Sequence, residues 1–213
     1  MTSGVESLYP FLYAGDTDAE QLRKEVSRST AEKAAEIAAL RTHMKKLHGP
    51  ALIDCALVMA ERFRRGGRLY TFGNGGSSSD AQAVAQLFCD PRHPRPLPAL
   101  ALTSDVATLT ALANDVGFDV VFARQIEAFA RPGDMVMGLS TSGGSGNVLR
   151  AFDQARRLGL LTIGFAGYDG GSMAGAATID HLFVVPSTSV HRIQEAQTTL
   201  YDVLWELVQR AMV

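Results

Sequence analysis

Residues 68–89 read RLYTFGNGGSSSDAQAVAQLFC and combine, in this order, a short apolar run, a glycine- and serine-rich turn and an amphipathic stretch. This succession is typical of a buried strand that leads through a tight turn into a helix. Four further apolar runs follow, at 97–102, 134–140, 160–166 and 181–185. Five buried strands that alternate with helices predict an α/β fold with a doubly wound, parallel, five-stranded sheet flanked by helices.

The helices between and after these strands are expected at 77–89, 105–113, 118–130, 145–158 and 190–211. Upstream of the first strand, residues 18–47 carry apolar side chains at helical spacing, and Gly49-Pro50 is expected to separate them from a second helix at 51–65. We therefore expect one domain over residues 1–213, in which 18–66 form a long N-terminal helical extension.

The last helix is apolar over much of its circumference, and the N-terminal helix is too long to stand alone. Both are expected to pack against other subunits. The sequence thus predicts a homo-oligomer in which residues 18–66 act as an oligomerisation segment.

The bulk composition limits the partners of the protein. A formal charge of -2 and a pI near 6.2 give no overall attraction to nucleic acid or to an anionic membrane. Cys55 and Cys89 both lie in apolar helical patterns and are expected to be reduced core residues. With no signal peptide pattern and no membrane-spanning run, these features predict a soluble, cytoplasmic protein.

Two loops that follow strands have the same polar character. Gly73–Asp80 and Ser140–Asn147 are rich in glycine, serine and asparagine, and each feeds directly into a helix. Glycine lets backbone N–H groups approach an anion, hydroxyls add donors, and the helix N-terminus contributes a positive dipole end. Tight turns and helix caps are the alternative interpretation. For a single loop the structural role is the commoner one. Neither loop matches a Walker P-loop or the dinucleotide fingerprint, which argues against nucleotide hydrolysis and NAD binding. Phosphate binding without lysine or arginine is the functional hypothesis for both loops.

Five motifs in order resemble the phosphoheptose isomerase group of sugar-isomerase (SIS) proteins. They are Gly73-Asn74-Gly75-Gly76-Ser77, Ala113-Asn114-Asp115, Ser140-Thr141-Ser142-Gly143-Gly144-Ser145, Gly167-Tyr168-Asp169-Gly170-Gly171 and Arg192-Ile193-Gln194-Glu195. The resemblance covers nearly the whole chain and implies the SIS fold and a tetramer with sites between subunits. The group contains sedoheptulose 7-phosphate isomerases as well as DnaA initiator-associating proteins, which share the fold without the isomerase site.

The resemblance also implies which residues meet a sugar phosphate. Those that correspond to the phosphate-binding loop are Ser140, Thr141, Ser142 and Ser145, and those that meet the sugar are Asn74, Gly75, Gly76, Ser77, Asp115 and Gln194. In the family, Gln194 faces the ligand or a metal. A small basic cluster, Arg92, His93 and Arg95, could aid anion capture, although a solvated loop is the favoured interpretation.

The chain departs from the isomerase pattern at three positions. Where the isomerases carry a His and a Glu four residues apart, and a second His eight residues after the glutamine, this chain has Ala83, Leu87 and Asp202. Isomerisation through an enediol needs a base, an acid and often a metal. We therefore predict no metal or other cofactor, although zinc occurs in the family, and assign catalysis only to Asp202, Gln194 and His191.

Three hypotheses remain open from the sequence. The main one is a phosphosugar-binding protein without the usual isomerase groups. The alternatives are an active sugar-phosphate isomerase with a rearranged site, and a non-enzymatic regulator that binds the replication initiator.

Overall fold

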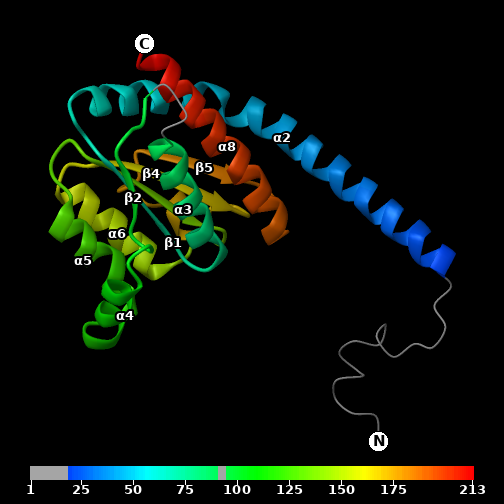
Figure 1. Ribbon diagram of the computed structural model, residues 1–213, viewed down its shortest axis with the longest axis horizontal. Coiled ribbons are helices and arrows are strands. Elements are labelled where there is room, and N and C mark those ends of the chain that lie inside the picture. Colours follow the sequence, from blue (N-terminus) through cyan, green and yellow to red (C-terminus); the bar gives the residue numbers. More distant parts are fainter. Residues whose placement is uncertain (1–18, 91–94) are drawn as a thin grey trace, which may run out of the picture. The chain divides into compact units, whose positions relative to one another are not determined.

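The computed structural model describes residues 19–90 and 95–213 and divides into two compact units, residues 1–40 and 41–213 (Figure 1). Helix α2 (Ala19–Arg64) runs through both. In the first unit its residues 19–40 are almost entirely exposed, whereas in the second its residues 44–63 bury one face. No helix in the described part of the chain has both the length and the apolar character to cross a membrane.

The second unit is built on a five-stranded sheet in which every pair of neighbouring strands is parallel, as predicted. Its order is β2-β1-β3-β4-β5, with β1 (Leu69–Gly73), β2 (Ala99–Ala101), β3 (Met135–Ser140), β4 (Leu161–Gly167) and β5 (His181–Val185). β2 is shorter than the predicted run 97–102. Proline has no N–H to donate to a ladder, and the parallel pairing with β1 begins one residue after Pro98, at Ala99.

Helices cover both faces of this sheet. Thr71 Oγ1 donates a hydrogen bond of 2.6 Å to the Ala81 carbonyl of α3 (Gly76–Cys89), and α8 (Val190–Ala211) contacts α3, β4 and β5. The next residue of β1, Phe72, packs its ring on Phe122 and Phe152 of α5 (Val121–Phe129) and α6 (Gly146–Arg157). Successive strand residues point to opposite faces, so α3 and the α5–α6 pair lie on opposite sides of the sheet.

Three short elements complete the fold. α4 (Val106–Asp115), which has no buried residue, and the 3-10 helix η2 (Phe118–Val120) follow β2, and α7 (Gly171–Ala174) follows β4. α7 was not predicted, since four residues carry no helical periodicity.

The predicted helix break at Gly49-Pro50 is wrong. Pro50 lies inside α2 with its ring exposed, while residues on either side of it bury the same helix face, among them Met44, Leu52 and Cys55. Apolar burial on both sides of the proline offsets the hydrogen bond that its missing N–H forfeits.

His48 is buried on this face of α2. Its Nε2 lies 2.8 Å from the Val184 carbonyl oxygen, and its ring meets Phe183 edge-on. A helical periodicity cannot by itself distinguish a buried histidine from a solvated one, because both fit the pattern.

The two cysteines differ, against the expectation that both lie in the core. Cys55 is fully buried, and burial raises the pKa of its thiol far above the ordinary value. Cys89 is exposed at the end of α3. Both are free thiols.

Candidate functional site

The two polar loops lie next to each other at one edge of the sheet. Their strands, β1 and β3, are neighbours, so the loops emerge side by side from the carboxyl ends. The side-chain amides of Asn74 and Asn147 join them by two reciprocal hydrogen bonds, of 2.8 Å and 2.9 Å. Asn147 was not singled out from the sequence, since only the topology shows that it faces the first loop.

The serine-rich loop brings three hydroxyls together. Ser140 Oγ lies 2.9 Å from Ser145 Oγ and 3.5 Å from Ser142 Oγ, and Ser142 Oγ accepts a hydrogen bond of 3.2 Å from the Gly144 N–H. Ser145 is the N-cap of α6, yet among the described residues its side chain caps no helical N–H. The first turn of α6 therefore keeps N–H groups for an anion, beside hydroxyls that can rotate to donate.

Close backbone packing fixes the shape of this loop. Gly143 has φ 64°, and an added Cβ would collide with the Gly170 carbonyl. The Gly167 N–H donates 3.0 Å to the Thr141 carbonyl, and the Met173 N–H donates 2.9 Å to that of Gly143. The glycines of residues 167–171 thus shape the serine-rich loop, a role that their motif alone did not reveal.

The first loop positions Gln194 of α8. Gly75, at φ 54°, turns the chain into α3, and Ser77 is buried just inside that helix. An added Cβ at Gly76 would collide with the Gln194 amide, so glycine leaves the space that this side chain fills. Gln194 Nε2 in turn donates a hydrogen bond of 3.3 Å to Asp80 Oδ2.

Asp80 is a site residue that the sequence reading missed. Burial raises the pKa of its carboxyl group, while hydrogen bonds from Gln194 and Tyr201 act in the opposite direction. Tyr201 also bonds to Thr198, and burial is the main cause that raises the pKa of its phenol. The sequence feature that could have identified Asp80 is its position, one turn into the helix that follows the glycine-rich loop.

Between α3 and α8 lies a cavity of about 670 Å³, which we call the α3–α8 pocket. It contains Ala83, Leu87 and Asp202, the three positions at which the resemblance implies a departure from the isomerase pattern. Its other lining residues are Gln86, Cys89, Asp90, Thr198 and Tyr201. The pKa of Asp202 is raised, chiefly by burial and further by the negative charge of Glu206.

The donor set of this pocket does not fit a zinc ion. Alanine and leucine offer no ligand atom, and the remaining donors of the lining, Cys89, Asp90 and Asp202, are short of the four ligands that zinc takes. Within residues 19–90 and 95–213, no three His, Cys, Asp or Glu side chains come together as a metal site. The chemistry proposed for this pocket therefore involves no metal ion.

A second hollow, of about 790 Å³, opens beside the serine-rich loop. Ser142 lines it together with Tyr168, Asp169, Pro186, Ser187 and Thr188. Tyr168 has φ 54°, the only positive φ at a non-glycine residue in the described chain. The exposed side of the loop thus faces open space large enough for a sugar phosphate.

Other predicted site residues are not joined to the loops by any contact within the described chain. Asp115 is exposed at the end of α4, where its Oδ1 accepts a hydrogen bond of 2.7 Å from Asn114. His191 is exposed in the first turn of α8. Arg95 donates 2.8 Å to the Met212 carbonyl, while Arg92 and His93 lie outside the described residues.

Comparison with known proteins agrees with this architecture. The SIS domain model matches residues 34–167. A phosphoheptose isomerase from Aquifex aeolicus is 43% identical over 188 residues, 87% of this chain and 94% of its own. Another from Paramagnetospirillum magneticum is 50% identical over 146 residues, 68% of this chain and 75% of its own.

A solved structure also resembles this chain in fold. Phosphoheptose isomerase from Neisseria gonorrhoeae superposes with a TM-score of 0.80 at 33% identity, over 87% of this chain and 99% of that one. The sheet order, the paired loops and these similarities converge. The chain belongs to the SIS-domain phosphoheptose isomerase family.

Proposed function

We propose that the protein is a sugar-phosphate isomerase that acts on sedoheptulose 7-phosphate or a closely related ketose phosphate. The observation that carries the proposal is the cluster of Ser140, Ser142 and Ser145 hydroxyl groups, joined through the Asn74–Asn147 pair to the loop that positions Gln194. The named activity of its relatives supports the same substrate class.

The proposed chemistry uses the groups around the α3–α8 pocket. In aldose–ketose isomerisation a base removes a proton from the carbon next to the carbonyl, while an acid protonates the carbonyl oxygen to give an enediol. The hydroxyl of the first carbon then returns its proton to the acid group, and the base delivers its proton to the former carbonyl carbon. Asp202 is the proposed base, since its raised pKa makes it a stronger proton acceptor than an ordinary aspartate. Gln194, held by Asp80, would orient the substrate by a hydrogen bond. His191 is a further candidate proton donor. A neighbouring subunit would have to complete the site around it.

The direct test is incubation of the purified protein with sedoheptulose 7-phosphate, with zinc and with a chelator. We expect aldose phosphate to accumulate equally in both, because the pocket lacks a zinc donor set. Asp202→Asn should lower kcat with little change in KM, while Ser142→Ala should raise KM. No product above the no-protein control would overturn the isomerase proposal.

A second candidate function is phosphosugar binding without isomerisation, as expected from the sequence. The observation that favours it is that Ala83 and Leu87, which line the pocket, have no titratable side chain. A thermal-shift series of sugar phosphates separates the two: a rise in Tm without turnover supports the binding protein. A pull-down with a replication initiator tests the regulator variant of this candidate.

We further propose one domain over residues 1–213 that assembles as a cytoplasmic homotetramer, with 18–66 as the oligomerisation segment. Exposed apolar side chains along α2 support this, including Leu47, Ile53 and Leu57, each about half exposed. In such an assembly Asp115 would reach the site of another subunit. Light scattering of the purified chain gives the subunit number, and Leu57→Glu should lower it.

A further inference from the structure

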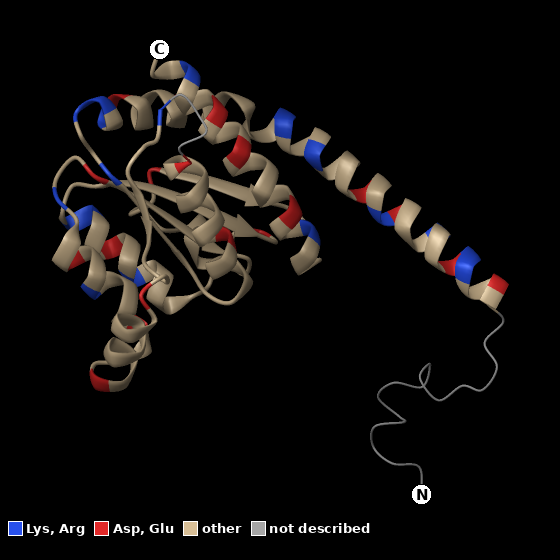
Figure 2. Ribbon diagram, viewed as in Figure 1, with Lys and Arg blue, Asp and Glu red and all other residues tan. Residues whose placement is uncertain are grey.

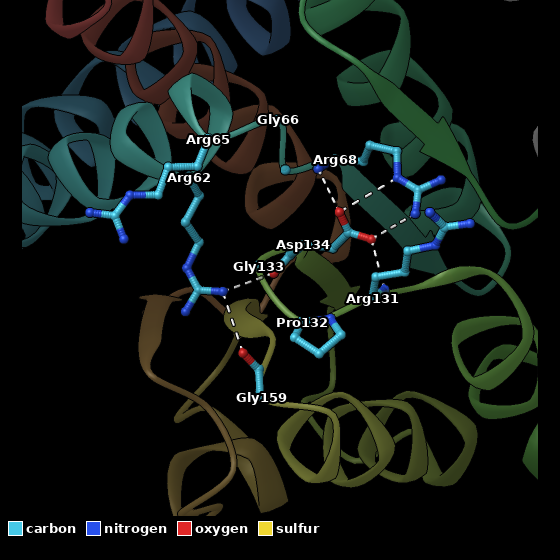
Figure 3. Close-up of a pocket in the computed structure, with 10 residues that line it drawn as sticks. Arg62, Arg65, Gly66, Arg68, Arg131, Pro132, Gly133, Asp134 and Gly159 are labelled. Carbon is cyan, nitrogen blue, oxygen red and sulfur yellow. Dashed lines mark hydrogen bonds and ion pairs between the residues drawn. The ribbon is translucent and has the colours of Figure 1, made fainter.

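A cavity of about 390 Å³ at the other end of the sheet is lined by four arginines (Figure 3). They are Arg62, Arg65, Arg68 and Arg131, and Asp134 is the only carboxylate among the lining residues. The cavity, called here the arginine pocket, thus has a formal excess of three positive charges. Figure 2 shows basic residues at the end of α2 and along the segment that leads into β1.

The arginine pocket is separate from the candidate sugar-phosphate site. Arg68 and Asp134 each stand one residue before a strand, β1 and β3, and Gly159 stands two residues before β4. The serine-rich and glycine-rich loops leave the opposite, carboxyl ends of β1 and β3. Strands of five and six residues put roughly 17–20 Å between the two edges.

Arg62 is held in place without losing its charge. Its Nη1 donates to two backbone carbonyls, that of Asp134 at 3.0 Å and that of Gly159 at 3.4 Å (Figure 3). Carbonyl oxygens orient a guanidinium group but do not neutralise it. The fixed group can therefore offer its remaining N–H donors, in the planar fork that matches phosphate oxygens.

The one carboxylate of the pocket is already occupied. Asp134 is buried, and its oxygens accept hydrogen bonds from the Arg68 and Arg131 backbone N–H groups, at 2.8 Å and 2.9 Å. Arg68 Nη2 adds a third bond of 3.0 Å. Asp134 thus offsets Arg68, whereas the guanidinium group of Arg131 has no partner among the described residues.

Comparison with a neighbouring cavity shows that this charge is not typical of the surface. A cavity of about 410 Å³ between α5 and α6 is lined by Arg124, Arg150 and Arg157, together with the carboxylates Glu127 and Asp153. Arg124 pairs with Glu127 at 2.9 Å. Two cavities of nearly equal volume therefore differ in charge balance.

We propose that the arginine pocket binds a small anion with two linked phosphate groups, of the pyrophosphate type. Its excess charge suits a multiply charged anion, and its guanidinium groups supply bidentate donors. None of its ten lining residues is aromatic, and five of them are glycine or proline. The pocket therefore has no aromatic surface on which a nucleobase could stack. The site thus recognises the diphosphate group itself.

The test is calorimetric titration of the full chain with pyrophosphate. Arg131→Gln, which leaves the backbone bond to Asp134 in place, should weaken binding about tenfold, the loss of one charge-assisted contact. Arg65→Gln should weaken it less, since Arg65 also pairs with Glu61 at 2.7 Å. Binding should weaken as ionic strength rises.

Two controls make the result decisive. Arg157→Gln removes an exposed arginine of the neighbouring cavity and should leave pyrophosphate binding unchanged. The double variant Ser142→Ala, Ser145→Ala removes hydroxyls of the other anion site and should also leave it unchanged. Absence of pyrophosphate binding, an equal effect of Arg157→Gln, or loss of binding in the serine variant would each overturn the proposal.

Discussion

The serine-rich loop and the α3–α8 pocket would carry their proposed functions through different kinds of atoms. The loop offers backbone N–H groups and hydroxyls that closely packed glycines hold in place, so the proposed anion site depends on the way the chain turns after β3. The pocket works through side chains that project from two helices. Side chains at helix positions such as Ala83 and Leu87 can be replaced without altering the backbone. The residues of the pocket can therefore vary while the backbone geometry of the loop is kept.

Rebuilding the missing ligands of the α3–α8 pocket should have the largest effect. In the triple variant Ala83→His, Leu87→Glu, Asp202→His, the first two side chains lie one helical turn apart and the third faces them across the pocket. With Gln194 nearby, the variant should bind one zinc ion with a Kd of micromolar or tighter, about -8 kcal/mol. Titration against a coloured chelator measures this, and the unaltered chain is the control. Failure to bind zinc would mean that these positions do not converge on one point.

A side chain at Gly143 should damage the serine-rich loop next most strongly. Gly143→Val combines a positive φ with a collision against the Gly170 carbonyl, which together should cost about 3 kcal/mol of unfolding free energy. Urea denaturation gives the value. Gly144→Val is the matched control, because its Cβ would meet only Ser142 Oγ, at 3.8 Å. Equal losses in the two variants would contradict the close packing of the loop.

Removal of single hydroxyls should weaken phosphate binding more moderately. Ser142→Ala or Ser145→Ala should each cost about 1.5–3 kcal/mol of sugar-phosphate affinity, a factor of roughly 10 to 150 in Kd. Calorimetry measures the change. Ser104→Ala, at an exposed residue outside both loops, is the control. Unchanged affinity in both loop variants would refute the assignment of the phosphate site.

The smallest effect concerns Asp80. Burial raises its folded pKa above the ordinary 3.8, so the folded state holds the proton more tightly, and stability falls as pH rises from that value through the raised pKa. Asp80→Asn should flatten this fall and raise Tm at neutral pH, as measured by thermal unfolding across the range.

Asp105 provides a control of opposite sign. It caps α4 by accepting from the Thr108 N–H, and this hydrogen bond lowers its pKa, so its contribution is lost as pH falls. Asp105→Asn should therefore flatten the acid side of the profile. Identical profiles for the two variants would argue against a raised pKa of the half-buried Asp80.

The alternation of apolar runs with glycine-rich turns sufficed to predict the five parallel strands, because buried strands and tight turns are local signals. The serine-rich loop was recognised for the same reason. The helix break predicted at Pro50 was wrong. The hydrogen bond that proline forfeits is evident from the sequence, whereas the burial of Met44 and Leu52 that offsets its loss depends on the tertiary structure. Cys89 misled in the same way: its place in an apolar pattern did not show that it lies on the exposed side of α3.

The sequence by itself therefore determined the α/β class and the five parallel strands. It also led to two hypotheses, anion binding by both loops and a departure from the isomerase pattern at Ala83, Leu87 and Asp202. Only the tertiary structure decided that Asn74 pairs with Asn147, that Asp80 holds Gln194, that the three departures line one pocket, and that four arginines gather at the far edge. These facts join residues as far apart in the sequence as Ala83 and Asp202. Local propensity specifies the elements, whereas strand order and helix packing decide which of their side chains meet.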